Sequence, residues 1–420
     1  MIFERKQYLQ KLISAEGNGM IKIVTGIRRC GKSFLLFNLF HDYLLRQGVG
    51  QDHIIELAMD DKRNRKLLDG DKLLEHIDSR IIADGGTTYI IIDEIQLVSD
   101  FVGVMLSLLH TRGVEVYVSG SNSRFLSKDV ATEFRGRGWE IRVHPLSFAE
   151  YYEGVGGEMM QAMHDYYTYG GLPMVPQLRT PEEKKQYLHD VATTIYIRDI
   201  IDRNRIQNEA GLTAILRVLA SGIGSSFNAR RIANTFQSTE HIAIGENTIH
   251  NYLLHLQDAF IISEAMRYDI KGRRYIGSEN KYYFEDLGIR NALTGFRQTD
   301  EVSHLMENML YNALCTAGCS VDVGMVQMWE RDAQGKTQRK QLEVDFVAGH
   351  FDRRIYIQSA YMLPDADKWA QEQRPLLSIP DSFRKVIITG EYRSGAYNQA
   401  GIYILGWYNF LLSPDSLSEI

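Results

Sequence analysis

Short apolar runs alternate with longer amphipathic stretches in the first part of the chain. Residues 3–15 repeat apolar side chains near helical spacing and predict an amphipathic helix. Five apolar runs predict strands, at residues 20–25, 53–59, 88–92, 115–119 and 139–143. The segments between these runs are long enough for crossover helices. Strands that alternate with helices in this way indicate an α/β fold, with a parallel sheet and helices on both of its faces.

The pattern changes after residue 146. Helical spacing dominates as far as about residue 205, interrupted by Tyr-Gly-Gly-Leu-Pro at 169–173, which predicts a turn. Residues 209–285 indicate three helices followed by a hairpin. The last part predicts a helix and three strands, at residues 305–317, 342–348, 354–360 and 385–389. A second α/β region is therefore expected at the end of the chain, after a helical middle.

The first predicted strand runs into Gly-Ile-Arg-Arg-Cys-Gly-Lys-Ser at 26–33, which matches the spacing G-x-x-x-x-G-K-S. Its glycines let the chain fold around phosphate oxygens with N–H groups pointing inward, and the following helix adds its N-terminal partial charge. Lys32 can reach the β- and γ-phosphates, and the Ser33 hydroxyl can bind Mg²⁺. The predicted ATP-binding residues of this P-loop are Gly26, Arg28, Arg29, Cys30, Gly31, Lys32, Ser33 and Phe34.

Two carboxylates follow the strand predicted at 88–92. Asp93 is placed to hold Mg²⁺ through water and Glu94 to polarise an attacking water. Alone, such a pair could equally be a solvated strand edge or a helix cap. Ser121 and Asn122 follow the next strand, where ligands of parallel sheets lie, and are candidates to contact the γ-phosphate. A polar turn is the alternative interpretation of these two residues.

Two arginines, Arg135 and Arg137, precede the fifth predicted strand. Charge develops on the γ-phosphate during transfer, so either guanidinium could act in trans on the nucleotide of a neighbouring copy. Surface arginines more often have no catalytic role. The pair hints at a homo-oligomer and nothing more.

Composition and charge narrow the class of protein. The 420 residues carry 47 Lys and Arg against 53 Asp and Glu, a net charge of −6 with a pI near 6.1. This balance excludes nucleic-acid binding by bulk positive charge, so any such contact needs a local patch. Three cysteines give neither a disulfide framework nor a zinc site. The charged N-terminus is unlike a signal peptide and no apolar run spans a membrane, so a cytoplasmic location is expected.

Several segments together resemble one family. They are GIRRCGKS at 26–33, YIIIDEIQ at 89–96, VYVSGSNSRFL at 116–126, RGR at 135–137, HPLSFAEYY at 144–152, YGGLP at 169–173, TIYIRDI at 194–200 and YYFEDLGIRNAL at 282–293. The chain is similar to prokaryotic AAA-type P-loop ATPases that carry a C-terminal domain of unknown function. The resemblance spans nearly the whole sequence. It matches Lys32, Ser33, Asp93 and Glu94 to the nucleotide and magnesium residues of the family, and implies ATP and Mg²⁺ as cofactors.

The resemblance also implies a division of the chain into four parts. These are an ATPase core at 1–146, a helical segment at 147–208, a winged-helix-like domain at 209–300 and a restriction-endonuclease-like domain at 301–420. The physiological role of most family members is not established. The middle part fits helices at 228–236 and 245–256 followed by a hairpin wing.

The winged-helix-like part offers candidate DNA contacts. The second of its helices carries Asn247, His250, Asn251 and His255, which can hydrogen-bond to bases but have no fixed positive charge. The cations that could contact phosphates are Arg230, Arg231, Lys271, Arg273 and Arg274. A neutral reading helix with a basic wing also suits a domain that packs on an ATPase or on a protein partner, so duplex DNA and an unknown protein both stay open.

The C-terminal part carries Glu343 and Asp345 two residues apart on a predicted strand, which places both on one face. Glu307 lies on the preceding helix. The layout resembles a nuclease core that binds magnesium, but Gln358 stands where a second acidic ligand belongs and Ala360 stands where the lysine belongs. Both losses weaken metal binding and catalysis. A degenerate, inactive nuclease-like site is therefore expected.

These observations lead to three hypotheses about function. The first is a Mg²⁺-dependent ATPase whose nucleotide state controls the attached winged-helix and nuclease-like domains, with a role connected to DNA. The alternative is a non-catalytic, nucleotide-gated adaptor for another protein. An ATP-regulated DNA nuclease is the least favoured of the three.

Overall fold

The computed structural model describes residues 1–121, 136–240, 244–297, 302–331, 337–350, 353–391 and 393–414. The chain packs as two compact units. Unit 1 contains residues 1–145, 172–177 and 258–260, and unit 2 contains 146–171, 178–257 and 261–420. None of the helices in these described ranges combines the length and the apolar character that crossing a membrane requires.

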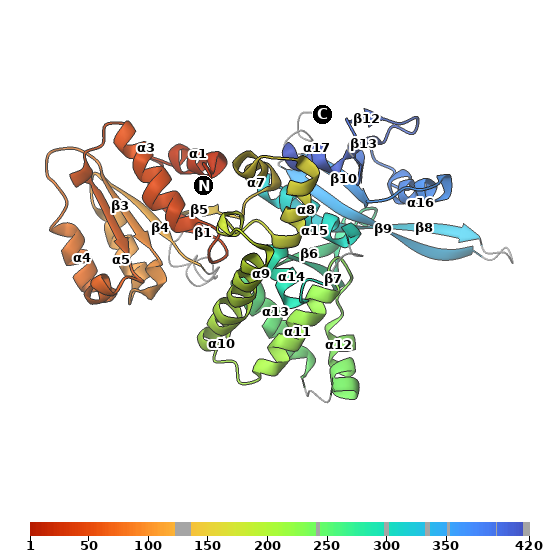
Figure 1. Ribbon diagram of the computed structural model, residues 1–420, viewed down its shortest axis with the longest axis horizontal. Coiled ribbons are helices and arrows are strands. Elements are labelled where there is room, and N and C mark those ends of the chain that lie inside the picture. Colours follow the sequence, from red (N-terminus) through yellow and green to blue (C-terminus); the bar gives the residue numbers. More distant parts are fainter. Residues whose placement is uncertain are drawn as a thin grey trace. The chain divides into compact units, whose positions relative to one another are not determined.

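Unit 1 is built on a five-stranded parallel sheet with the order β2-β3-β4-β1-β5 (Figure 1). Its strands are β1 (Ile21–Thr25), β2 (Ile54–Ala58), β3 (Thr88–Asp93), β4 (Val114–Ser119) and β5 (Gly138–Arg142). All five begin and end within one residue of the predicted runs, so the expected parallel α/β sheet is confirmed. Its α-helices are α1 (Lys6–Ser14), α2 (Lys32–Phe34), α3 (His41–Arg46), α4 (Gly70–Asp78) and α5 (Phe101–His110). A π-helical segment, Leu35–Phe40, joins α2 to α3 without a break.

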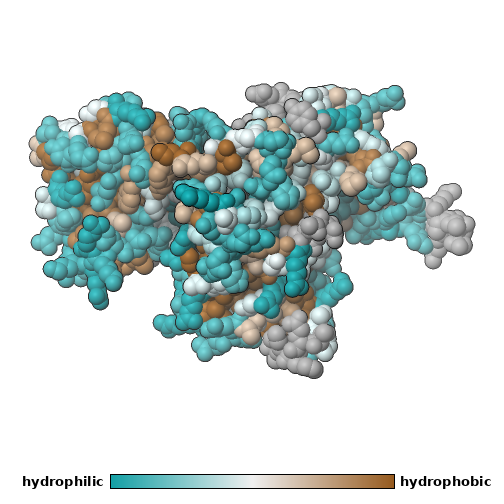
Figure 2. Space-filling model, in the orientation of Figure 1, coloured by the Kyte–Doolittle hydropathy of each residue, from teal (hydrophilic) through white to brown (hydrophobic). Residues whose placement is uncertain are grey.

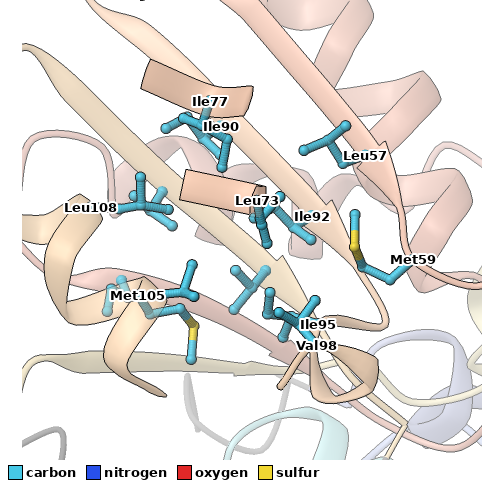
Figure 3. Packing of buried hydrophobic residues seen from close by; sticks show 14 of the residues in the cluster. Leu57, Met59, Leu73, Ile77, Ile90, Ile92, Ile95, Val98, Met105 and Leu108 are labelled. Carbon is cyan, nitrogen blue, oxygen red and sulfur yellow. The ribbon is translucent and has the colours of Figure 1, made fainter. Parts of the chain in front are cut away.

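The two faces of this sheet are covered differently. Alternate residues of a strand point to opposite faces, so Ile90 and Ile92 lie on one side of β3 and Tyr89 on the other. The isoleucines belong to a cluster with α4 and α5 that contains Leu73 and Met105 (Figure 3). On the opposite face Phe40 packs on Tyr89 and Tyr117, with ring centroids 6.5 and 4.5 Å apart. Helices therefore flank both faces, as an α/β sheet requires.

Unit 2 contains an eight-stranded mixed sheet with the order β12-β13-β11-β10-β9-β8-β6-β7. Its strands are β6 (Ile262–Asp269), β7 (Arg274–Phe284), β8 (Ser320–Arg331), β9 (Thr337–His350), β10 (Arg353–Ala360), β11 (Arg384–Thr389), β12 (Ala396–Tyr397) and β13 (Tyr403–Gly406). β6 pairs with β7 in an antiparallel hairpin and with β8 in parallel. The hairpin expected as a wing thus forms two strands of the C-terminal sheet. β8, the strand that makes this connection, was not predicted from the sequence.

The helices of unit 2 come largely before this sheet in the chain. They are α7 (Phe148–Val155), α8 (Met159–Tyr169), α9 (Pro181–Asp190), α10 (Arg198–Asn204), α11 (Glu209–Ser221), α12 (Ala229–Thr235), α13 (Glu246–Asp258), α14 (Leu287–Leu293), α15 (Val302–Thr316), α16 (Ala366–Leu377) and α17 (Trp407–Leu412). No break between compact units accompanies the predicted borders at 208 and 300 in the described residues. The four-part division stays a prediction.

Two motifs of the family resemblance pack on each other in unit 2. Gly170 and Gly171 end α8, and Asp286 caps α14. The Asp286 carboxylate accepts hydrogen bonds from the N–H groups of Gly171, at 2.7 Å, and of Ile289, at 3.0 Å. A Cβ on Gly170, whose φ is +77°, would lie 2.3 Å from Asp286 Oδ1. The glycines of Tyr-Gly-Gly-Leu-Pro are therefore needed for this close approach.

The surface shows no single dominant apolar patch on the face seen in Figure 2, where hydrophilic side chains cover most of the area. Exposed large apolar side chains are distributed along the chain, with Met160, Trp329 and Met362 the most exposed of those after the first two residues. Scattered apolar residues of this kind are normal on soluble domains and by themselves indicate no docking site.

Candidate nucleotide site

The P-loop follows β1 and depends on two glycines. Gly26 has φ +140°, and a Cβ there would lie 2.1 Å from the carbonyl oxygen of Val143. Gly31 has φ +101° and is the N-cap of α2. Both conformations are strained for any residue with a side chain. The spacing of the motif is thus set by the two positions where the backbone takes conformations that glycine tolerates.

Lys32 lies inside this loop. Its side chain is 5% exposed, and its Nζ donates hydrogen bonds to the carbonyl oxygens of Gly26 and Ile27 at 2.9 and 3.0 Å. The loop therefore surrounds the ammonium group and holds it at the end of β1. Cys30 is fully buried, with its Sγ 3.3 Å from the Val143 carbonyl oxygen, so it fits the loop as a small packed residue.

Asp93 joins three elements at the carboxyl edge of the sheet. The Ser33 hydroxyl, at the start of α2, donates to Asp93 Oδ2 at 2.6 Å. The Ser119 hydroxyl, at the end of β4, donates to Asp93 Oδ1. Because β4 lies between β1 and β3, its last residue is placed between the P-loop and the carboxylates. Ser119 was not among the predicted site residues, and the signal for it was its place at the end of the strand next to β1.

Glu94 occupies a left-handed backbone conformation directly after β3, with φ +53°. Its Oε2 accepts hydrogen bonds from Gln96 Nε2 and from the hydroxyl of Ser121, the latter at 3.2 Å. Its backbone N–H donates to Ser119 Oγ at 3.3 Å. The carboxylate is thereby turned toward the end of β4. Ser121, one of the two predicted γ-phosphate contacts, is buried and lies in this network.

The remaining predicted residues of the ATPase part are not brought together in the same way. Asn122 and Arg135 lie outside the described residues. Arg137 precedes β5, and its carbonyl oxygen accepts from the N–H of Ile21 at the start of β1. The P-loop follows the opposite end of β1, so Arg137 is not part of the site of its own chain. In the P-loop itself, Arg28 is half-buried, whereas Arg29, Ser33 and Phe34 are exposed.

The donor set fits a nucleotide with magnesium. Ser33 Oγ and Asp93 Oδ2 are hard oxygen ligands held together at the point where the P-loop meets the end of β3. Lys32 supplies a buried positive charge within the same loop. These residues could hold Mg²⁺ and the phosphates of ATP, and Glu94 could orient a water molecule.

The cations predicted as DNA contacts differ in their surroundings. Arg230 and Arg231 on α12 are exposed. Lys271 Nζ donates to the carbonyl oxygen of Gln327 at 2.8 Å, and Arg274 Nε lies 3.9 Å from a carboxylate oxygen of Asp269. Arg273 lines a separate open cavity of about 440 Å³ together with Arg353 and Arg354. Two of the three cations at the hairpin turn thus already have partners within the chain.

The C-terminal carboxylates converge on a lysine. Lys281 of β7 places its Nζ 3.0 Å from Glu307 Oε1 and 2.8 Å from Glu343 Oε1. The Tyr283 hydroxyl also donates to Glu307 Oε1, at 2.7 Å. Asp345 is buried, and its Oδ2 accepts from the Ser359 N–H at 2.7 Å. Position 360 on β10 is an alanine where a lysine was expected, and Lys281 of β7 supplies a lysine to the cluster instead. This residue was not predicted from the sequence.

Burial and charge shift the pKa values in this cluster. Burial raises the pKa of Asp345 well above its ordinary value, and the carboxylate of Glu307 adds to the effect, against the opposing influence of Lys281. Burial alone would lower the pKa of Lys281, but the charges of Glu307, Asp345 and Glu343 outweigh it and raise that pKa. Lys281 therefore stays positively charged throughout the ordinary pH range.

This cluster does not fit a metal ion. Within the ranges that the structure describes, no group of three His, Cys, Asp or Glu side chains is arranged to hold one. The ammonium of Lys281 lies where the oxygens of Glu307 and Glu343 converge. Gln358, expected in the place of an acidic ligand, is buried, and its Oε1 has no hydrogen-bond partner among the described residues.

Comparisons with known proteins agree with the nucleotide site. Residues 18–152 match the AAA domain family, and residues 160–300 match a domain of unknown function. An uncharacterized protein of Haemophilus influenzae is 31% identical over 97% of this chain and 98% of its own length. An uncharacterized protein of Methanocaldococcus jannaschii is 25% identical over 83% of this chain and 76% of its own.

Solved structures show weaker likeness. The ORC1 protein of Aeropyrum pernix in complex with DNA has 12% identity and a TM-score of 0.28, over 70% of this chain and 93% of that one. The AMPPCP-bound DnaA of Aquifex aeolicus has 12% identity and a TM-score of 0.29, over 61% and 88%. Scores this low have no bearing on function. The evidence of relationship is the full-length sequence match together with the AAA domain match, and the chain belongs to the same family of AAA-domain proteins as the protein of Haemophilus influenzae.

Proposed function

We propose that this protein binds ATP and hydrolyses it with Mg²⁺, and that its nucleotide state controls the region after residue 146. The observation that carries the proposal is the contact of Ser33 Oγ with Asp93 Oδ2 at 2.6 Å, beside a lysine buried in its own P-loop. A chance glycine-rich turn would not bring together a serine, an aspartate and a lysine from two separate elements. Mg²⁺, when bound, neutralises charge on the β- and γ-phosphates.

Each side chain of the site has a distinct task in this proposal. Lys32 exchanges its hydrogen bonds to the loop carbonyls for phosphate oxygens, which keeps its buried charge satisfied. Ser33 and Asp93 supply the oxygens for the metal. Glu94 accepts a proton from an attacking water or orients it, and Ser119 fixes the carboxylate of Asp93.

The test is ATP turnover by the full chain with Lys32→Ala. We expect the variant to lose nucleotide affinity and hydrolysis together, because the buried ammonium is the main positive charge inside the loop. Lys62→Ala is the matched control, since Lys62 is an exposed lysine of the same unit. Hydrolysis by Lys32→Ala at the rate of the parent protein would refute the proposal.

A nucleotide-gated adaptor without turnover is the second candidate. The observation in its favour is that Gln96 Nε2 and the Ser121 hydroxyl both donate hydrogen bonds to Glu94 Oε2. Hydrogen bonds to the ionised carboxylate make it a weaker base toward water. Glu94→Gln separates the two candidates. We expect tight ATP binding with turnover reduced by about a hundredfold or more, as for the loss of a general base. Unchanged slow turnover in Glu94→Gln would favour the adaptor.

We also propose a DNA contact by the part at residues 209–300. The exposed arginines of α12 and Arg273 are among the cations of this part that could reach phosphates. Duplex binding titrated against salt should show a slope that falls when Arg230, Arg231 and Arg273 are neutralised together. Absence of binding at low salt would make a protein the better partner for this part.

A further inference from the structure

An open cavity lies at one end of the eight-stranded sheet, where β8, β10 and β11 begin and β9 ends. Five neighbouring strands, β6, β8, β9, β10 and β11, or the turns beside them, supply its lining. Its volume is about 440 Å³, within the range of small-molecule sites, about 300–1,000 Å³. Arg354 in its lining and Gln358 in the carboxylate cluster are four residues apart on β10, which is about 13 Å along a strand. The cavity is therefore separate from that cluster.

The hollow depends on a glycine in the sheet. Gly349 of β9 pairs with Arg354 of β10 on one side and with Ser320 of β8 on the other. Side chains of paired residues project to the same face, so the missing side chain at Gly349 leaves a gap between those of Ser320 and Arg354. A Cβ at Gly349 would lie 2.8 Å from Ser320 Oγ, and a larger residue would displace that hydroxyl. The pairing of three neighbouring strands thus builds the space for a ligand.

Positive charge predominates in the lining. Three arginines against one aspartate give it a net formal charge of +2. The aspartate, Asp381, accepts hydrogen bonds on both oxygens, from the Tyr356 hydroxyl at 2.6 Å and from the Phe383 N–H at 3.2 Å. The arginines are Arg273, Arg353 and Arg354. A phosphate monoester carries close to two negative charges near neutral pH, and guanidinium groups bind its oxygens in pairs, so this anion matches the lining.

One of these arginines is held beside aromatic rings. Arg354 Cζ lies 5.0 Å from the ring centroid of Tyr268 and 5.7 Å from that of Phe383. Attraction between a cation and the face of a ring holds the guanidinium in place without a ligand. Phe383 is 42% exposed, and Ile270 adds apolar surface to the same cavity. Nucleobases stack on aromatic rings and on guanidinium planes, so the lining offers a surface for a base next to the cations for a phosphate.

We propose that this cavity binds a nucleotide through its phosphate monoester, with Arg353 and Arg354 on the phosphate and Phe383 against the base. A free nucleoside monophosphate and the 5′-phosphorylated end of a nucleic-acid strand carry this same group. The inference does not rest on the ATPase proposal, since the cavity shares no residue with the site at the P-loop. Arg273 also belongs to the proposed contact with duplex DNA, so the test leaves it unchanged.

The experiment measures binding to the full chain by isothermal titration calorimetry at low salt. All proteins carry Lys32→Ala, which removes the lysine of the P-loop. Adenosine and thymidine 5′-monophosphates are the free ligands, and a short single strand of DNA with a 5′-phosphate presents the strand end. The nucleosides and the same strand with a 5′-hydroxyl lack the phosphate monoester. We expect at least one phosphorylated ligand to bind, and its counterpart without the phosphate to bind about tenfold more weakly or less.

Substitutions in the lining should weaken this binding. Arg353→Gln and Arg354→Gln should each raise the Kd about tenfold or more, because each removes hydrogen bonds to a charged group. Phe383→Ala should raise it by about tenfold through the loss of base stacking. Arg339→Gln, a change at an exposed arginine of β9 outside the cavity, is the matched control and should leave the Kd unchanged.

The relative affinities identify the source of the phosphate. Tighter binding of a monophosphate than of the phosphorylated strand would identify a free nucleotide, and the reverse would identify a strand end. Three results would overturn the inference: no binding of any phosphorylated ligand at millimolar concentration, equal binding with and without the phosphate, or a Kd unchanged in both arginine variants. Inorganic phosphate that binds as tightly as the monophosphates would likewise overturn it, because the base would then contribute nothing.

The test does not depend on one variant. Arg354 packs on two rings, so Arg354→Gln could fail to fold, whereas Arg353 is exposed and its replacement gives the same test. The P-loop is common to all variants. The same differences in Kd are therefore measurable without Lys32→Ala, if that change prevents folding.

Discussion

Replacing Asp286 with asparagine should remove a pH dependence from the stability of unit 2. Asp286 is fully buried, and its carboxylate accepts hydrogen bonds from the N–H groups of Gly171 and Ile289. Burial raises the pKa of Asp286 from 3.8 to about 6, against the lowering effect of the backbone N–H groups. Between these two pKa values, the Asp286 carboxyl is protonated in the folded chain and ionised in the unfolded chain.

The sign and size of the effect follow from that difference. Between about pH 4 and pH 6 the folded state binds more protons than the unfolded state, so stability falls as the pH rises. Each pH unit in this window corresponds to about 1.4 kcal/mol. The interval between 3.8 and about 6 gives a loss of about 3 kcal/mol, complete somewhat above pH 6 and absent below pH 4. Asparagine does not titrate, so Asp286→Asn should change the free energy of unfolding by the same amount at every pH.

Urea unfolding followed by tryptophan fluorescence is a suitable assay. Trp407 is buried in unit 2 and reports on its unfolding. The difference in stability between the parent and Asp286→Asn should shift by about 3 kcal/mol from pH 4 to pH 7, to the disadvantage of the parent. At a slope of about 3 kcal/mol per M this is about 1 M urea. A constant difference over this range, or one that moves in favour of the parent, would refute the reasoning.

Three further substitutions test the ATPase part. Gly26→Ala should abolish nucleotide binding because the new Cβ meets a carbonyl oxygen at 2.1 Å, whereas Gly48→Ala, also at positive φ but with no atom within 4 Å, should keep it in a filter-binding assay. Ser119→Ala should lower turnover more than ATP affinity, measured by steady-state kinetics, because it frees one oxygen of Asp93; equal losses in both would contradict this. Ile92→Ala should destabilise unit 1 by about 2–5 kcal/mol in thermal unfolding, since Ile92 is fully buried. A loss below about 1 kcal/mol would mean that neighbouring side chains move in and fill the cavity.

The parallel sheet of unit 1 could be predicted almost to the residue because its central strands, β1 and β3, are compact apolar runs. A strand buried on both faces, such as β3 with its burial along all six residues, leaves a continuous signal in the sequence. The P-loop was predictable for a different reason. The backbone conformation at position 26 and the nearby Val143 carbonyl oxygen leave no room for a Cβ, so this position requires glycine. A requirement of this kind is visible in the spacing of the motif alone.

The parts that sequence reasoning missed depend on long-range pairing. Ser119 is an ordinary strand-end serine until the sheet order places β4 next to β1. Lys281 is one lysine in a hairpin, and only the parallel pairing of β6 with β8 brings it to Glu307 and Glu343. β8 was missed for another reason: its alternation of polar and apolar residues at 320–323 is itself a strand signal, but it is short and is interrupted where the register shifts between Asp322 and Gly324. Pairings between distant segments set these contacts, and periodicity does not encode them.

Because β6 and β7 share one sheet with the strands after residue 320, the region after residue 300 is not an independent module. Residues 301–420, separated from the hairpin, would lose the counter-ion that the buried Glu307 shares with the partly exposed Glu343. They would also expose the edge of β8, a row of unpaired backbone groups that favours aggregation. Recombination, truncation or proteolysis near residue 300 would therefore divide one sheet and would not release a stable domain. The smallest C-terminal piece that keeps its charges balanced and its sheet edge covered begins before residue 262.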